Sequence, residues 1–311
     1  MHQRFTALKN YGENDLKQLK NSTVAVIGLG TTGSVIAEHL ARHGVKLKIF
    51  DRDYLEEKDL YTSTLYTRED TEKALPKAVA AEKHLEQFTE VEKFNKHVKP
   101  GETSELEDVE LIMDGTDNIR TRQLINDFSK KHGIPWIYTA VVGEKGYSML
   151  FDQKCFNCLL NNQKQLNSLE TCETAGVMRE TASIIASKSS RKAIKLLTGE
   201  NVTEKLETVS ESFEVETNSC KVCREEEFHH LERSESSASL CGENKYLLER
   251  KVTEAALERL KQVSEVEAEN KHLVQAKIGE RQLTVFRDGR IIVEARDKGH
   301  AEATVSEALG I

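Results

Sequence analysis

An apolar run that ends in glycine is the first clear strand pattern along the chain. Residues 24–28 (Val-Ala-Val-Ile-Gly) are typical of a buried strand, and residues 32–43 carry apolar side chains at helical spacing. A second strand is predicted over 46–50, where apolar and polar residues alternate before Asp51-Arg52-Asp53. A strand, a glycine-rich turn, a helix and a strand in this order predict a β-α-β unit of the length that binds nucleotides.

Strand and helix patterns keep alternating along the following residues. Further strands are predicted over 91–98, 109–113, 136–142 and 147–151, and helices over 76–87 and 119–132. This alternation predicts an α/β fold with a Rossmann-like, mostly parallel sheet and helices on both of its faces. Ligands are expected at the carboxyl ends of the strands.

The pattern changes after Cys155. The polar run 159–171 indicates an exposed crossover loop, and residues 177–198 regain helical spacing. The charged, serine-rich run 224–239 indicates a linker.

We therefore expect a first domain over 1–230, a linker over 231–244 and a small α+β unit over 245–311. The elements predicted for the small unit are helices at 252–262 and 300–309 and strands near 263–268, 272–278, 282–286 and 290–294. The Asp288-Gly289 pair between the last two strands is typical of a tight hairpin.

Composition narrows the possible function classes. The chain has 311 residues and a mass of 35.1 kDa, with 38% apolar and 31% charged residues, which is typical of a globular protein. Its net charge of −8 argues against a nucleic-acid partner, because no stripe of Lys and Arg stands out. No apolar stretch approaches the roughly 18 residues of a membrane span. We expect a cytoplasmic protein with no membrane partner.

The glycine-rich turn is the first candidate binding site. Gly28, Gly30 and Gly33 lie between a predicted strand and a predicted helix, so backbone N–H groups at the start of that helix can face a phosphate. Asp51 follows the second strand, where a carboxylate can accept hydrogen bonds from ribose hydroxyls. An NAD-dependent oxidoreductase shares these features and is the alternative. The cysteines in the second half of the chain favour a class of protein other than the oxidoreductases.

Two C-x-x-C pairs form the second candidate site. Cys155 and Cys158, together with Cys220 and Cys223, can supply thiolates to one tetrahedral Zn²⁺. In a reducing compartment, this pattern favours a metal or catalytic use over disulfides. Such a zinc site has no open ligand position and is expected to be structural. Free or redox-active thiols are the alternative.

The order of the motifs along the chain is more specific than any one of them. The motifs, in the order met, are G-x-G-x-x-G at 28–33, D-x-D at 51–53, Pro76-Lys77, D-G-T-D-N-x-x-T-R at 114–122, the first C-x-x-C pair, C-E-T-A-G-V-M at 172–178 and the second C-x-x-C pair. Together they resemble the ThiF/MoeB/HesA branch of the ubiquitin-activating-enzyme superfamily. The resemblance covers roughly residues 4–224.

This resemblance implies an ATP-dependent adenylyltransferase that activates the C-terminal carboxylate of a small β-grasp carrier, such as a ThiS-, MoaD- or ubiquitin-like protein. By position, Asp51 would hold the ribose and Lys77 would neutralise the phosphates. Asp117 would act in catalysis near the α-phosphate and Mg²⁺. The implied ATP site comprises Gly28, Gly30, Thr31, Gly33, Asp51, Asp53, Lys58, Asp59, Thr62, Lys77, Asp117 and Asn118. A homodimer is also implied, in which Arg4 is lent to the neighbour's ATP; a disordered N-terminal segment is the alternative for Arg4.

One stretch departs from the family pattern. The family usually carries S-N-L-x-R after the D-x-D, whereas this chain has Lys58-Asp59-Leu60-Tyr61-Thr62. Thr62 stands where an arginine would clamp phosphate, and a threonine cannot replace that guanidinium. Lys58 and Arg68 lie close by in sequence and are the candidates to compensate. If neither residue compensates, we expect slow turnover or unusual substrate use. A protein that binds ATP but has lost catalysis is the further alternative.

Two cysteines lie outside the C-x-x-C pairs. Cys172 precedes a predicted helix, where a thiolate is stabilised. In relatives the matching cysteine can capture the carrier covalently, and in MoeB-like members it is dispensable, so both interpretations stay open. Cys241 resembles a C-G motif in the C-terminal extensions of some ThiF-like proteins. It is expected either to relay sulfur or to be a small buried residue.

Overall fold

A computed structural model describes residues 2–161, 176–215, 220–232, 238–239 and 245–310. The chain divides into two compact units. Unit 1 comprises Met1–Asp53, Lys58–Tyr66 and Lys77–Ser234. Unit 2 comprises Glu235–Ile311 together with two segments from the first half of the chain, Tyr54–Glu57 and Thr67–Pro76. None of the described helices is both long enough and apolar enough to cross a membrane.

Unit 1 is built on an eight-stranded sheet in the order β3-β2-β1-β4-β5-β6-β7-β8. The strands that run parallel to one another are β1 (Thr23–Ile27), β2 (Lys46–Phe50), β3 (Val91–Phe94), β4 (Leu111–Asp114) and β5 (Trp136–Val142). The antiparallel strands that extend the sheet beyond β5 are β6 (Lys145–Phe151), β7 (Leu206–Glu207) and β8 (Ser212–Phe213). The predicted Rossmann-like, mostly parallel sheet is confirmed.

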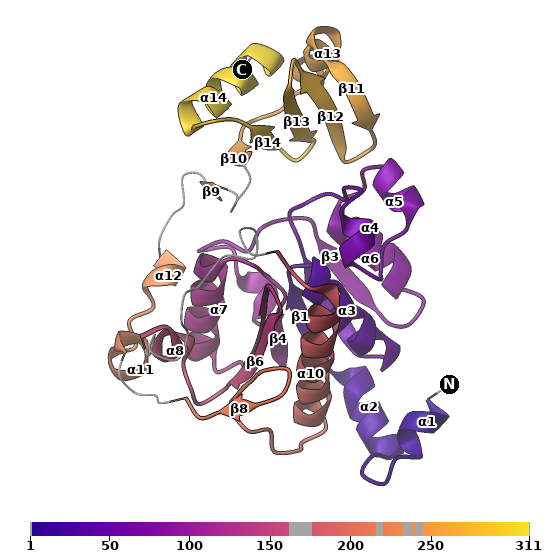
Figure 1. Cartoon of the computed structure of the whole chain (residues 1–311), viewed down its shortest axis with the longest axis vertical. Coiled ribbons are helices and arrows are strands. Elements are labelled where there is room, and N and C mark those ends of the chain that lie inside the picture. The colour runs from indigo at the N-terminus through magenta and orange to yellow at the C-terminus, as the bar shows by residue number, and fades with distance from the viewer. Residues whose placement is uncertain (1, 162–175, 216–219, 233–237, 240–244, 311) are drawn as a thin grey trace. The chain divides into compact units, whose positions relative to one another are not determined.

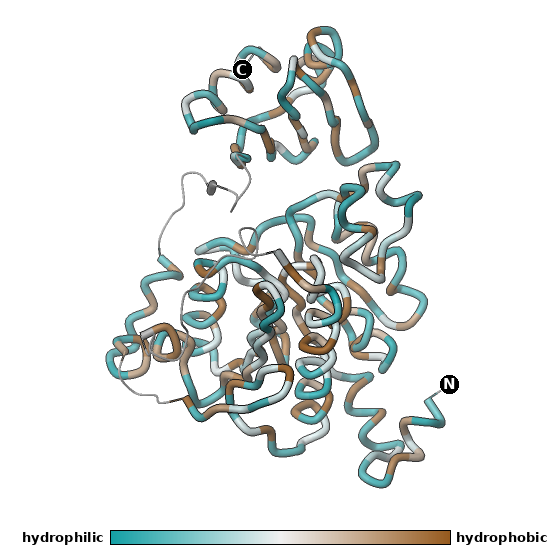
Figure 2. Tube along the Cα trace, viewed as in Figure 1, coloured by the Kyte–Doolittle hydropathy of each residue, from teal (hydrophilic) through white to brown (hydrophobic). Residues whose placement is uncertain are grey.

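Helices cover both faces of this sheet (Figure 1). The crossover helices on one face are α3 (Thr31–Arg42) and α6 (Lys77–Leu85), and α10 (Arg179–Leu197) packs beside α3. Helix α7 (Ile119–His132) connects β4 to β5 on the other face. Figure 2 shows hydrophobic residues along the central strands and mixed hydropathy along the helices. This pattern is expected when a parallel sheet is buried on both sides.

Local signals explain where helix α7 begins and ends. The Asn118 side chain accepts hydrogen bonds from the backbone N–H groups of Arg120 and Thr121, so it caps the amino end. Gly133 ends the helix with φ of 68°, a left-handed conformation that favours glycine. Both ends agree with the helix that the sequence predicts over 119–132.

Short elements complete unit 1. They are α1 (Gln3–Thr6), α2 (Glu13–Asn21), α4 (Asp59–Thr62), a 3-10 turn at Ser104–Leu106, α8 (Phe156–Asn161), α11 (Lys221–Glu225) and α12 (His229–Glu232). Helices α11 and α12 place regular structure in the part of the run 224–239 that was expected to be a linker. The domain boundaries expected at 230 and 244 stay a prediction.

Unit 2 is built on a six-stranded sheet in the order β11-β12-β13-β14-β10-β9, in which every pair is antiparallel. Its strands are β9 (Ala238–Ser239), β10 (Lys245–Glu249), β11 (Glu265–Glu269), β12 (Leu273–Ile278), β13 (Arg281–Phe286) and β14 (Arg290–Glu294). Its helices are α13 (Glu254–Val263), α14 (Lys298–Leu309) and the short α5 (Arg68–Glu72). The predicted small α+β unit is therefore present, with a strand at 245–249 that the sequence did not predict.

The strand predicted over 91–98 is wrong in its second half. Strand β3 ends at Phe94, and its last residue pairs with Phe50, the last residue of β2. Because β3 lies at the edge of the sheet, residues 95–98 have no strand beside them to continue the ladder. These residues instead lead His97 and Val98 toward the pocket described next.

Candidate nucleotide site and cysteine cluster

The glycine-rich turn joins β1 to α3 through close contacts between backbones. Gly28 has φ of +85°, and a Cβ atom built there would lie 2.7 Å from the carbonyl oxygen of Gly115. A Cβ on Gly33 would lie 1.9 Å from the carbonyl oxygen of Gly28, which no side chain can tolerate. Gly33 is therefore required for packing between helix and turn, and it does not line the pocket.

The amino end of α3 opens onto this turn. Gly30 is the residue before the helix, and Thr31 and Thr32 form its first turn and line the pocket. The first backbone N–H groups of a helix have no partner within the helix, and the helix dipole favours an anion beside them. The turn therefore offers an anion-binding position.

Asp51 follows β2 and faces the turn. Its carboxylate accepts hydrogen bonds from the backbone N–H groups of Leu29 at 2.7 Å and Asp53 at 2.8 Å. Burial, and then the neighbouring Asp53 carboxylate, raise the pKa of Asp51 to about 6. Asp51 is thus held in a fixed orientation with ionised oxygens at neutral pH.

Lys77 is the first residue of α6 and lies among carboxylates. Its Nζ atom lies 3.0 Å from Oδ1 of Asp59, and the two side chains are only 12% and 9% exposed. Burial by itself would lower the pKa of Lys77, but the carboxylates of Asp59, Asp53 and Asp51 outweigh it and raise that pKa. Lys77 is therefore a permanent cation in the pocket.

The loop after β4 is held by a buried ion pair. Arg122 Nε lies 2.9 Å from Oδ2 of Asp114, and Arg122 also donates to the backbone carbonyls of Thr116 and Thr139. Asp114 Oδ1 accepts hydrogen bonds from the backbone and side chain of Thr116. Asp114 and Arg122 are the first and last residues of the D-G-T-D-N-x-x-T-R motif, and their pairing was not among the predictions from the sequence. The pair fixes the loop that presents Asp117.

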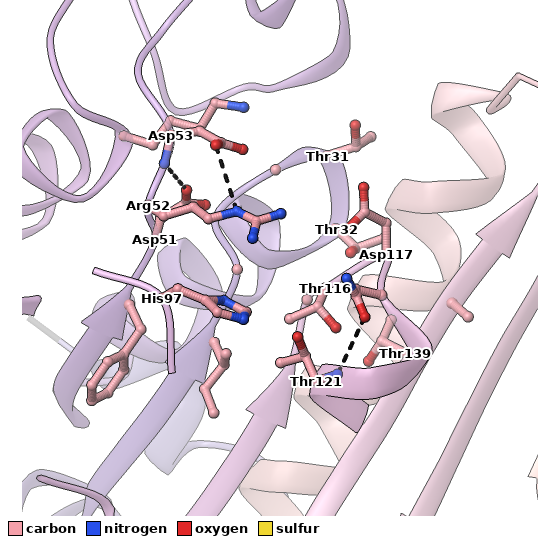
Figure 3. Close-up of a pocket in the computed structure, with 18 of the residues that line it drawn as sticks. Thr31, Thr32, Asp51, Arg52, Asp53, His97, Thr116, Asp117, Thr121 and Thr139 are labelled. Carbon is pink, nitrogen blue, oxygen red and sulfur yellow. Dashed lines mark hydrogen bonds and ion pairs between the residues drawn. The ribbon is translucent and has the colours of Figure 1, made fainter. Parts of the chain in front are cut away.

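These elements enclose a cavity of about 370 Å³ at the carboxyl ends of β1, β2 and β4. Figure 3 shows Asp51, Arg52, Asp53 and His97 on one side of it and Thr31, Thr32 and Asp117 on the other. The volume falls within the roughly 300–1,000 Å³ of small-molecule sites. The expected ATP-site residues that line the cavity are Gly28, Gly30, Thr31, Asp51, Asp53, Lys58, Asp59, Thr62, Lys77, Asp117 and Asn118.

Several lining residues were not predicted. Arg52 lies inside the D-x-D motif, and His97 follows the edge strand. Burial, and then the Arg52 guanidinium, lower the pKa of His97 to about 4, so its imidazole is neutral at physiological pH. A neutral ring beside the pocket can give or accept a hydrogen bond with an uncharged group such as a base. Arg52 and His97 follow strands β2 and β3, and this position at the carboxyl end of a strand could have indicated that they line the site.

Some of the other predicted residues do not line the cavity. Arg4 is exposed on α1 and is not among the residues that line the cavity. Arg68, a candidate to compensate for Thr62, lies 3.9 Å from Glu57 and does not line the cavity either. Lys58, the other candidate, does line it. Cys172 and Cys241 lie outside the described residues, so their roles stay predictions.

The two C-x-x-C pairs come together in unit 1. The Sγ atoms of Cys155, Cys158, Cys220 and Cys223 all lie within 4.8 Å of one another. The Cys155–Cys220 and Cys158–Cys223 sulfur atoms are 3.6 Å apart, far longer than the roughly 2.05 Å of a disulfide. Burial raises the pKa of the Cys220 thiol to about 11, and also raises that of Cys223.

A buried asparagine orients this cluster. Asn126 on α7 donates from Nδ2 to Cys155 Sγ at 3.4 Å and accepts at Oδ1 from the backbone N–H of Phe156 at 2.8 Å. Cys155 and Cys220 immediately precede the short helices α8 and α11, and Cys158 and Cys223 lie within them. The cluster therefore joins the end of β6 and the segment after β8 to one face of α7.

The fold and the cavity together define the class of protein. A glycine-rich turn at a helix amino end, opposite a carboxylate that follows the second strand of a parallel sheet, is the arrangement of a Rossmann-like nucleotide-binding protein. The ThiF family model matches residues 2–234. The chain belongs to the ThiF family.

Individual relatives agree with this assignment. The sulfur carrier protein ThiS adenylyltransferase of Bacillus subtilis is 33% identical, and the match covers 96% of each chain. A sulfur carrier protein adenylyltransferase of Thermus thermophilus is 27% identical over 64% of this chain and 77% of that protein. Among solved structures, Escherichia coli MccB with ATP superposes with a TM-score of 0.57 at 18% identity, covering 67% of this chain and 68% of MccB. This last likeness is one of fold.

Proposed function

We propose that this protein is an ATP-dependent adenylyltransferase that activates the C-terminal carboxylate of a small β-grasp sulfur-carrier or ubiquitin-like protein. The observation that carries the proposal is the cavity at the carboxyl ends of the parallel strands, where Thr31, Asp51 and Lys77 meet. Membership of the ThiF family, and the printed names of the relatives, favour this reaction over NAD-dependent oxidation.

The proposed reaction joins two anions. A carboxylate oxygen of the carrier attacks the α-phosphorus of ATP, the bond to the β-phosphate bridging oxygen breaks, and pyrophosphate leaves. The Lys77 cation and the amino end of α3 offset the negative charge that gathers in this step. Asp51, fixed by two backbone N–H groups, would accept the ribose hydroxyls.

Mg²⁺, when bound with ATP, screens the charge of the triphosphate. The Asp117 carboxylate is exposed and lines the cavity, and a carboxylate oxygen is the donor that Mg²⁺ prefers. Asp117 is therefore the residue that would hold the ion. Asn118 lines the cavity, and its side chain caps α7 and so fixes the backbone next to Asp117.

We also propose that the four cysteines hold a structural Zn²⁺. Sulfur ligands at a Zn–S distance of about 2.3 Å in tetrahedral geometry lie roughly 3.8 Å apart, and two of the observed separations are 3.6 Å. Asn126 supplies the hydrogen bond to a ligand sulfur that metal sites usually carry.

A homodimer is part of the same proposal. Arg4 is exposed and does not line the cavity of its own chain. In the family pattern this arginine serves the partner's ATP. If it does so here, Arg4→Ala chains mixed with Lys77→Met chains are expected to regain exchange activity that neither variant has alone. Equal activity of the mixture and the separate variants would contradict the lent arginine.

Pyrophosphate exchange tests the main proposal. The wild-type chain with ATP and candidate carriers is expected to exchange labelled pyrophosphate into ATP, and Asp117→Asn is expected to reduce the rate by about 100-fold or more. Because Asp117 is exposed, its replacement should leave thermal unfolding unchanged. Asp152→Asn, an exposed aspartate after β6, is the matched control. Normal exchange in Asp117→Asn would rule out its assigned role, and binding of NAD but not ATP would overturn the proposal.

The pKa of Asp51 predicts how ribose binding depends on pH. Ribose hydroxyls donate hydrogen bonds to the ionised carboxylate, so the affinity is present at neutral pH and is lost as the pH falls through about 6. Adenosine is the suitable probe, because it lacks phosphates that titrate in the same range. Its inhibition constant against ATP is expected to rise between about pH 7 and about pH 5. A constant value over this range would show that Asp51 does not hold the ribose.

A further inference from the structure

Two segments of the chain leave unit 1 between β2 and α6 and join unit 2. They are Tyr54–Glu57 and Thr67–Pro76. Each is continuous in sequence with residues that line the cavity: Asp53 precedes the first segment, Lys58 follows it, and Lys77 follows the second. The stretch Lys58–Tyr66 between them carries the departure from the family pattern. The part of the chain that builds one wall of the cavity is thus held at both ends by unit 2.

The sheet of unit 2 is apolar on both faces. Alternate residues of its strands, such as Val285 and Ile291, pack in one buried cluster with residues of α13 and α14. The residues of the opposite face that pack against Tyr54 and Ala74 are Leu247, Leu273, Phe286 and Ile292. Tyr54 and Ala74 are 5% and 2% exposed, so the two segments are the cover of this face. Without them unit 2 would expose a large apolar surface to water.

Polar contacts fix the second segment in position. Asn270 Nδ2 donates to the backbone carbonyls of Lys73 at 2.8 Å and Ala74 at 3.3 Å. Asn270 Oδ1 accepts from the backbone N–H groups of His272 and Leu273, so both ends of the amide are used. Ala74 has φ of 45°, a left-handed conformation that an L-residue rarely adopts. Its carbonyl is held in that conformation by Asn270.

The two segments are also locked to each other. Leu55 N–H donates to the Leu75 carbonyl at 2.8 Å, and the neighbouring Lys77 N–H donates to the Asp53 carbonyl at 2.8 Å. Tyr54 and Pro76 form the bridge between these two bonds. A shift of Ala74 would therefore be transmitted through two residues to Lys77, the cation of the cavity.

We propose that unit 2 is a positioning element for the nucleotide site. Its sheet face and Asn270 hold the segments that follow β2 and precede α6. These contacts fix the positions of Lys77 and of the Lys58–Thr62 stretch. This rests on the proposed function, in which these residues meet ATP. It assigns a role in nucleotide binding to distant residues such as Asn270, which lies 197 and 196 positions from the two residues whose carbonyls it binds.

Asn270→Asp tests this proposal with little change in shape. The aspartate keeps the oxygen that accepts from His272 and Leu273, but places a second carboxylate oxygen against the Lys73 and Ala74 carbonyls. The turn inside unit 2 is kept, and the link to the segment is lost. We expect the KM for ATP to rise about tenfold, because small displacements of a binding group carry large costs, with a smaller change in kcat.

A matched pair of variants separates positioning from general destabilisation. Ile292 lies on the face that contacts the segments and Ile291 on the face that contacts the helices, and they are neighbours on β14. Ile292→Val is expected to raise the KM for ATP, whereas Ile291→Val is expected to lower the unfolding temperature of the chain without changing that KM. Equal effects of the two variants on the KM would overturn the proposal.

Hydrogen exchange keeps this test independent of the proposed function. In the Asn270→Asp chain without ATP, the backbone amides of 58–62 and of Lys77 are expected to lose protection, while those of Ile291 and its neighbours keep it. Unchanged protection at these amides would overturn the positioning role even if exchange activity is found. Lost protection in Asn270→Asp, combined with a wild-type chain that fails to bind ATP, would support the positioning role and contradict the proposed function.

Discussion

Replacing Lys77 with methionine is expected to lower the rate of ATP–pyrophosphate exchange by about 10²–10³-fold, the effect of removing one preorganised electrostatic contact from a reacting site. Methionine keeps much of the length and apolar stem of lysine, so the change removes mainly the charge. The cation lies 3.0 Å from Asp59 and is also close to Asp51 and Asp53. Without it these carboxylates would lose the lysine charge that offsets them beside the triphosphate.

The same replacement is expected to destabilise the fold, and a double variant separates the two effects. Removing one partner of a buried ion pair costs about 3–5 kcal/mol, because the other charge is left buried. Lys77→Met with Asp59→Asn removes both charges, so it should recover most of the thermal stability while exchange stays low. Lys83→Met, at an exposed lysine on the same helix, is the control. Recovery of exchange in the double variant would show that Lys77 acts only through folding.

Asp59→Asn alone is the second single variant of a double-mutant cycle with Lys77→Met. It also tests the departure from the family pattern. Asp59 places a carboxylate in the cavity wall and pairs with the lysine that phosphate needs. A carboxylate that lines the same cavity as a phosphate repels it and also offsets the charge of the neighbouring lysine, so its neutralisation favours phosphate binding. We therefore expect the asparagine variant to bind ATP about tenfold more tightly. Weaker ATP binding by a variant that unfolds at the wild-type temperature would contradict this repulsive role of Asp59.

The parallel half of the fold could be predicted because its signals are local. The buried run of β1, the glycines after it and the cap residues of α7 each specify their own element, and most predicted boundaries differ from the structure by only a few residues. Strand β3 was predicted too long because an edge strand ends where its partner ends, and a partner's length cannot be read from the strand itself.

The contacts that complete the candidate site could not be predicted in the same way. Asp114 and Arg122 belong to one motif, yet their pairing depends on the loop that carries Thr116 turning back over the helix start. The association of Tyr54 and Ala74 with a sheet that begins near residue 238 is set by packing between distant parts of the chain. The Asp59–Lys77 pair is of the same kind, since it joins the start of one helix to the start of another.

Replacing Cys155 with serine is expected to abolish stoichiometric zinc binding and to lower the free energy of unfolding by about 4 kcal/mol or more, as loss of a metal site often does. A serine hydroxyl is a poor substitute for a thiolate, and three remaining sulfurs cannot complete the tetrahedral site. The loss should be large because the cluster joins the end of β6 to the segment before α11, two parts of the chain that are more than 60 residues apart. Metal content after extensive dialysis and thermal unfolding measure the two effects.

Cysteines outside the cluster provide the matched control for this variant. Cys241→Ser removes a thiol from a position that belongs to neither C-x-x-C pair, so zinc content should stay at the wild-type value. Asn126→Ala, which removes the hydrogen bond to Cys155 but no ligand, is expected to weaken zinc affinity about 10–100-fold and to retain the metal at saturating zinc. Stoichiometric zinc in Cys155→Ser would exclude the four-thiolate site. Loss of zinc without loss of stability would show that the ion does not hold the two segments together.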